Sequence, residues 1–134
     1  MAIEVTKNSI DLGIVNRNPE AMLAFYRDTL GFEFEGEMPM PGGGSMQRLL
    51  CGTSLIKLVT PGNLSDNDPA PGGIPGATGY RYWTISVPSV DAITETCTSA
   101  GAKLAVPPTD LRPGIRISIV EDPDGNWLEF LQAG

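Results

Sequence analysis

The chain has 134 residues, of which 41% are hydrophobic and 19% are charged, a composition typical of a globular domain and not of a disordered segment. Lys and Arg number 9 and Asp and Glu 16, a formal net charge of −7, which argues against nucleic acid or an anionic membrane surface as a partner. Histidine is absent from the sequence, which excludes His-ligated zinc and iron sites and histidine-dependent catalytic triads.

The sequence shows no sign of export or membrane insertion. No apolar run approaches the ~18 residues that a membrane helix needs, and the N-terminus has no basic region followed by an apolar segment. We therefore expect a cytoplasmic protein. Cys51 and Cys97 are far apart and in no metal-binding spacing, so we expect two buried free thiols.

The first part of the chain has the pattern of a strand, a helix and three strands. Residues 9–15 alternate as a strand does. Asn18 predicts an N-cap and Pro19 the first helical residue, and Gly31 predicts the helix end. The residues that follow at helical spacing are Met22, Phe25, Tyr26 and Thr29. Strands are then expected to begin at residue 32 and to cover residues 45–51 and 54–60.

The second part repeats this order. Residues 80–87 alternate, Ser89 predicts a helix cap, and Gly101 predicts the helix end. One face of this helix carries Val90, Ile93, Cys97 and Ala100. Extended structure resumes at residues 102–104, and strands are expected over 114–121 and 126–132. The sequence Asp-Pro-Asp-Gly at 122–125 predicts the turn between the last two strands.

The matched order of elements predicts a duplicated β-α-β-β-β module with a period of about 70 residues. We expect one domain over residues 1–134, with module one at about 8–60 and module two at about 79–132. A linker rich in Pro and Gly covers 61–78. The predicted fold class is α+β: two tandem βαβββ modules forming an eight-stranded open trough or barrel with two outer helices.

A second irregular stretch, residues 38–44, reads Met-Pro-Met-Pro-Gly-Gly-Gly and is expected to form a mobile loop at a strand edge. Two interpretations remain open for it. Met38, Met40 and Met46 would form a soft lid over an apolar ligand, or the stretch is an ordinary loop with incidental methionines.

Four strands each place a polar group opposite an apolar face, because successive strand residues point to opposite sides. The apolar faces are Ile10, Leu12 and Ile14; Ile56 and Leu58; Trp83, Ile85 and Val87; and Leu128 and Phe130. The helices need these faces to pack on. The opposite faces carry Asp11, Lys57, Tyr82 and Glu129. We expect these four to converge in a site, the alternatives being an internal salt-bridge network or a solvated sheet face.

Two segments resemble the vicinal oxygen chelate superfamily of glyoxalases, bleomycin-resistance proteins and extradiol dioxygenases. They are Phe-Tyr-Arg-Asp-Thr-Leu-Gly-Phe at 25–32 and Asp-Pro-Asp-Gly-Asn-Trp-Leu-Glu-Phe at 122–130. With the duplicated module, the resemblance covers nearly the whole chain. The superfamily spans many chemistries, so the resemblance indicates fold more strongly than function.

In metal-dependent members of that superfamily, two ligands come from each module. The resemblance places these positions at Asp11, Lys57, Tyr82 and Glu129, where the family usually has His, Glu or Gln, His, and Glu. A protonated lysine cannot ligate a metal. We therefore expect no bound metal and no cofactor, which would remove mechanisms that need a metal as Lewis acid.

The first functional hypothesis is a metal-independent enzyme. Lys57 would take the electrostatic place of the metal, Asp11 or Glu129 would act as general base, and Tyr82 would donate a hydrogen bond or a proton. The reactions that fit are isomerisation, elimination, or hydration or hydrolysis of a small, partly apolar molecule such as an epoxide or carbonyl compound. Further substrate contacts are expected from Tyr80, Thr84, Trp127, Arg116 and Met46.

The second hypothesis is a non-catalytic protein that binds a small molecule or drug, as resistance proteins resembling this one do. The acidic balance would suit a cationic ligand, and the aromatic residues would form walls. The resemblance also implies a homodimer. A small molecule is the expected partner in both hypotheses, with neither nucleic acid nor membrane.

Overall fold

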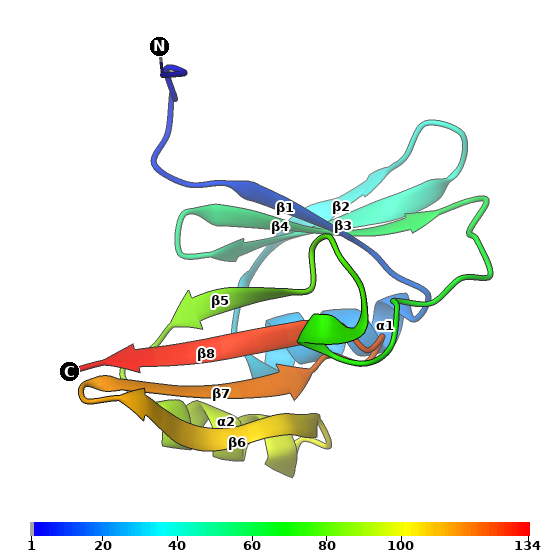
Figure 1. Ribbon diagram of the computed structural model, residues 1–134. Coiled ribbons are helices and arrows are strands. Elements are labelled where there is room, and N and C mark those ends of the chain that lie inside the picture. Colours follow the sequence, from blue (N-terminus) through cyan, green and yellow to red (C-terminus); the bar gives the residue numbers. More distant parts are fainter. Residues whose placement is uncertain (1) are drawn as a thin grey trace. The chain divides into compact units, whose positions relative to one another are not determined.

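The computed structural model describes residues 2–134 and divides them into two compact units, one ending at Ser65 and the other beginning at Asp66 (Figure 1). The division falls inside the stretch predicted as a linker. Each unit contains one four-stranded sheet. Within residues 2–134, no helix is both long and apolar enough to span a membrane.

The first unit begins with strand β1 (Asp11–Val15) and a helix made of α1 (Pro19–Leu23) and a π-helical turn, η1 (Ala24–Thr29). Strands β2 (Glu33–Pro39), β3 (Gly44–Cys51) and β4 (Ser54–Pro61) follow. The sheet order is β1-β4-β3-β2. β1 runs parallel to β4, and the other two pairings are antiparallel.

The second unit has the same plan, preceded by a short 3₁₀ turn, η2 (Ile74–Gly76). It comprises β5 (Tyr82–Ser86), α2 (Val90–Ser99), β6 (Lys103–Arg112), β7 (Ile115–Glu121) and β8 (Trp127–Ala133). The sheet order is β5-β8-β7-β6, with β5 parallel to β8. The predicted α+β class and the duplicated βαβββ module are therefore confirmed, while the trough that would join the sheets stays a prediction.

The ends of both helices lie close to their predicted positions. Ser89 Oγ accepts a hydrogen bond from Ala92 N at 3.1 Å, which confirms it as the cap of α2. Gly31 and Gly101 follow the helix ends with positive φ. Asn18 holds the N-cap position, but its side chain makes no capping bond. Its φ of −114° and ψ of 74° lie outside the extended region from which a side chain caps a helix.

In each unit the helix and one face of the sheet form the core. In the first unit, Met22, Phe25 and Tyr26 are buried, as are Leu49, Ile56 and Leu58 of the sheet. Phe25 and Tyr26 pack edge to face, with ring centroids 4.9 Å apart. The predicted apolar face of the first strand is shorter than expected: Ile10 is exposed, because pairing with β4 begins at Asp11.

In the second unit, α2 packs on β6, β7 and β8. The apolar side chains Val90, Cys97, Val120, Leu128 and Phe130 are buried. Inside this core, the hydroxyls of Thr94 and Ser118 lie 2.7 Å apart and hydrogen-bond to each other. Because unpaired buried hydroxyls are costly, this pair fixes which face of β7 meets the helix.

The two ends of the methionine-rich stretch are strand, and residues 40–43 connect them. Met38 lies in β2 and pairs in register with Met46 of β3, so the connection shrinks to a turn closed by Gly43 N donating to Met40 O at 3.1 Å. Gly44 follows with φ +84°, and a Cβ there would lie 2.1 Å from Thr60 O. Only glycine fits at this position, because the neighbouring strand passes too closely.

Both cysteines are free, as expected, but only Cys97 is buried. Cys51 ends β3 beside the Gly52–Thr53 turn and is half-buried, so the prediction of two buried thiols is wrong for this residue. Burial raises the pKa of the Cys97 thiol to about 11 and also raises the pKa of Cys51.

We predict that Asp122→Ala lowers the free energy of unfolding by about 1–3 kcal/mol. Asp122 Oδ1 accepts hydrogen bonds from Asp124 N at 3.0 Å and Asn126 N at 2.9 Å, and Asp122 is only 4% exposed. Urea denaturation would measure the change. Asp122→Asn keeps one oxygen acceptor and should lose less, so equal losses in both variants would contradict this role for the turn.

We predict that Cys51 reacts faster than Cys97 with a thiol-specific reagent at neutral pH. The thiolate is the reactive form, and Cys97 is buried with the higher pKa. Labelling of Cys51→Ser and Cys97→Ser, each followed in native buffer and in denaturant, would separate the two thiols. Equal labelling rates of the two thiols in native buffer would contradict this prediction, because they would show that burial under α2 does not protect Cys97.

Candidate functional site

The first unit brings two of the four predicted residues together. Asp11 lies on β1 and Lys57 on β4, and the parallel register pairs Asp11 with Leu55 and Gly13 with Lys57. The two side chains therefore share the sheet face opposite Ile56 and Leu58. Lys57 Nζ lies 3.4 Å from Asp11 Oδ2.

A second lysine holds Asp11 more closely. Lys7 Nζ donates to Asp11 Oδ1 at 2.7 Å. This hydrogen bond is the main cause of a lowered Asp11 pKa; Lys57 lowers the pKa further, and partial desolvation acts in the opposite direction. A carboxylate with a lowered pKa is a weaker base, so Asp11 is less suited to removing a proton than a free aspartate would be.

The same face carries a further ion pair that sequence reasoning missed. Arg48 on β3 lies directly opposite Lys57 in register. Arg48 Nη2 and Nε are each 3.3 Å from Glu35 Oε1. A signal for the position of Arg48 opposite Lys57 exists in the sequence. The two-residue turn at Gly52–Thr53 pairs Cys51 with Ser54, and counting back from that turn pairs 48 with 57.

The donor set in the first unit does not fit a divalent metal. Of the two positions where the resemblance implies ligands, one is a lysine, which has three donors and no acceptor when protonated. The other is a carboxylate already contacted by two lysines, at 2.7 Å and 3.4 Å. A cation placed beside Asp11 would have to displace these ammonium groups and would still face Lys57.

The second unit groups four predicted residues in two adjacent register pairs on one face of its sheet. Tyr82 pairs with Trp127, and Thr84 pairs with Glu129. Thr84 Oγ1 donates to Glu129 Oε1 at 2.8 Å, which orients the carboxylate. Tyr82 is 47% exposed, so its phenol is accessible. The result is an aromatic pair followed along the strands by a fixed carboxylate.

The linker stretch positions Trp127. A Cβ at Gly73 would lie 2.4 Å from the Trp127 ring, so this glycine lets the loop backbone pack against the indole. Arg81 fixes the loop by donating from Nε to Gly73 O at 3.0 Å and from Nη2 to Gly73 O and Pro71 O. Glycine and proline content predicted only a linker here, because it carries no sign of a contact with a distant indole.

The remaining predicted contacts lie elsewhere. Met46 on β3 pairs with Val59 on the Lys57 face of the first unit. Tyr80 precedes β5 and is fully exposed. Arg116 does not join Thr84 and Glu129, because it lies on the α2 side of β7, where it pairs with Asp91 at 3.0 Å and Asp110 at 3.1 Å.

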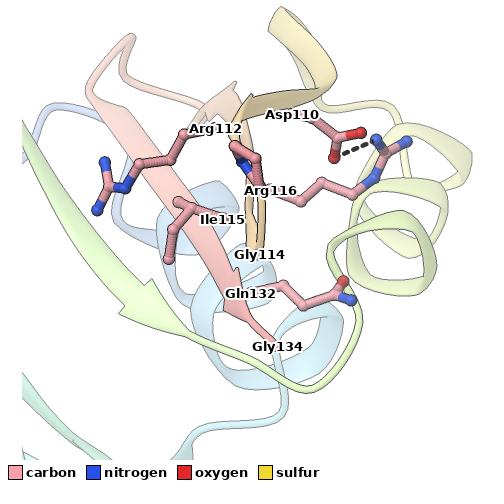
Figure 2. A pocket seen from close by; sticks show the side chains of 8 residues that line it. Asp110, Arg112, Gly114, Ile115, Arg116, Gln132 and Gly134 are labelled. Atoms are coloured by element: carbon pink, nitrogen blue, oxygen red, sulfur yellow. Dashed lines mark hydrogen bonds and ion pairs between the residues drawn. The ribbon is translucent and has the colours of Figure 1, made fainter.

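An open pocket of about 420 Å³ adjoins Arg116 at the β6–β7 turn. Figure 2 shows Arg116 and Gln132 pointing to one side of the strands and Arg112 to the other. The polar groups on the first side already have partners within the protein. Arg116 forms ion pairs with Asp91 and Asp110, and Gln132 Oε1 accepts a hydrogen bond from Val90 N at 2.9 Å. This pocket contains none of Asp11, Lys57, Tyr82 and Glu129.

Comparison with solved structures supports the fold along the whole chain. A glyoxalase family protein from Bacillus cereus has a TM-score of 0.80 and 20% identity, covering 99% of this chain and 98% of its own. TnmS3, an antibiotic binding protein from Streptomyces sp. CB03234, has a TM-score of 0.70 and 20% identity, covering 100% and 99%. A glyoxalase family protein from Enterococcus faecalis has a TM-score of 0.67 and 25% identity, covering 96% of each chain.

No curated protein sequence matches this chain at a significant level. The sequence profile of one family does, over residues 9–130, and this range contains both βαβββ modules up to the middle of β8. The chain belongs to the Glyoxalase/Bleomycin resistance protein/Dioxygenase superfamily.

Proposed function

We propose that this chain binds a small, partly apolar organic molecule without a metal ion. The observation that carries the proposal is the Asp11–Lys57 ion pair on the sheet face opposite the buried Ile56 and Leu58. These two groups form an ion pair, and neither is arranged as a metal ligand. Both side chains are about one-third exposed, so a ligand can still reach them.

The second unit supports the same proposal. Tyr82 offers exposed aromatic surface beside the partly buried Trp127, and Glu129, oriented by Thr84, offers a hydrogen-bond acceptor next to this pair. Binding sites for small molecules are mainly apolar with a few fixed polar groups. TnmS3, which is named as an antibiotic binding protein, has this fold at a TM-score of 0.70, so the fold is compatible with ligand binding.

Metal-independent turnover is the second candidate. The arrangement that favours it is Glu129, held at 2.8 Å by Thr84 on the face that also carries the accessible Tyr82. A carboxylate base and a phenol donor would serve isomerisation, elimination or addition of water. In this candidate Glu129 is the base, because the contacts of Asp11 with Lys7 and Lys57 weaken its basicity.

One experiment distinguishes the two candidates. The protein is incubated in EDTA with a library of metabolites and drugs, and mass spectrometry scores each compound as retained, consumed or ignored, with isomers separated by chromatography. We expect at least one compound to be retained and recovered intact. Consumption of a compound would establish the second candidate, and a library ignored throughout would contradict both.

We predict that Tyr82→Ala weakens binding of the retained compound by about 3- to 10-fold, the magnitude of a lost aromatic contact. Isothermal titration would measure the Kd. Tyr80→Ala is the matched control, because Tyr80 is two residues away and fully exposed. A loss of equal size in both variants would show that Tyr82 has no specific role.

If a compound is consumed, we predict that Glu129→Gln lowers kcat by about 100-fold or more, since the amide cannot accept the proton. Tyr82→Phe should then lower kcat more than it raises KM. Circular dichroism would check that both variants are folded. If both variants raise KM and leave kcat unchanged, Glu129 and Tyr82 contribute to binding and not to chemistry.

A further inference from the structure

One register row crosses all four strands of the first unit. It runs Gly13, Lys57, Arg48 and Gly36, with the two cations on the central strands and a glycine on each outer strand. A Cβ at either glycine would meet no atom within 4 Å. Neither outer strand therefore places a side chain in this row itself.

The charges in this row are not fully balanced. Like charges directly opposite on neighbouring strands destabilise a sheet, so Lys57 and Arg48 repel each other. Asp11 and Glu35 lie at their outer sides at 3.4 Å and 3.3 Å, longer than the 2.7–2.9 Å typical of charge-assisted bonds. Asp11 is also shared with Lys7 at 2.7 Å, which leaves three cations linked to two carboxylates.

Both central cations have donors to spare. Glu35 contacts only Nε and Nη2 of Arg48. Among the contacts of residues 2–134, the Nη1 donors of Arg48 are therefore free. The side chains of Lys57 and Arg48 are 30% and 33% exposed. Apolar register pairs lie on either side along the strands: Leu50 with Leu55, and Met46 with Val59.

We propose that Lys57 and Arg48 together bind an oxyanion, a carboxylate or phosphate group, on the small-molecule ligand. This inference rests on the proposed ligand-binding function and deepens it by naming the ligand's charged group. An oxyanion between the two cations would relieve their repulsion and accept hydrogen bonds from both. The apolar pairs would then contact the carbon skeleton attached to it.

NMR titration of the ¹⁵N-labelled protein tests the subsite directly with three probes: benzoate, neutral benzamide and inorganic phosphate. We expect saturable shifts of backbone amides in β3 and β4 and of the Arg48 side chain with benzoate, with phosphate, or with both. The comparison of these two anions identifies which oxyanion the subsite takes. Benzamide should cause smaller shifts that do not reach Arg48.

Two variants of different kinds remove the subsite. Lys57→Met keeps the chain length and removes the charge, and Gly13→Asp supplies a carboxylate beside Lys57 in open space. Each should weaken anion binding at least about tenfold. Gly13→Asn, of equal size and no charge, should weaken it less than Gly13→Asp. Lys103→Met removes an exposed lysine of the second unit and should leave the Kd unchanged.

The outcomes separate this inference from the function on which it rests. Anion binding that is lost in Lys57→Met and kept in Lys103→Met supports the subsite. If neither anion binds, or if both variants bind equally well, the subsite is overturned, while retention of neutral compounds in the library screen would leave the proposed function intact. A library that is ignored throughout would overturn the function independently of the anion result.

Discussion

The parallel pairing between the first and last strands of each module is the constraint on which the rest of the structure depends. It joins β1 to β4 and β5 to β8 and so places residues more than forty positions apart side by side. A parallel pair needs a long crossover, and here the crossover includes the helix that covers one face. With that face committed to the core, side-chain alternation leaves the polar residues of both strands on the other face.

Sequence patterns predicted features whose cause is local. Ser89, Gly101 and the turn at 122–125 each depend on a few neighbouring residues, and the structure confirms them. The π-helical turn was not predicted, because it has no sequence motif of its own and the spacing of Met22, Phe25 and Tyr26 is equally typical of a regular α-helix. Composition likewise carried no sign of the contact between Gly73 and Trp127.

The candidate site shows the same division between local and distant causes. Alternation alone predicted that Asp11 and Lys57 share a face, and they form an ion pair. It did not predict Lys7, which reaches Asp11 from outside the strand, or Arg48, whose place depends on hairpin register. Arg116 shares its side of β7 with Ser118, and the bond from Ser118 to Thr94 is a buried contact that strand alternation cannot reveal. Net charge was also a poor guide to the row that contains Lys57 and Arg48. The total of −7 is summed over the whole chain, and salt screens charges that lie more than about 10 Å away. It therefore does not give the sign of the charge at one place on a sheet.

The π-helical turn of the first unit has a consequence for how this sequence can change. Such a turn is equivalent to one residue inserted into an α-helix. Deleting one residue within Ala24–Thr29 would let the helix close as regular α while the residues on either side keep their orientation. Deleting one residue from the regular α1 turn before it would instead rotate the residues before the deletion by about 100° relative to those after it, so that Met22 and Phe25 could not both keep their buried positions. The π-helical turn is therefore the part of this helix that is expected to tolerate the loss of a residue.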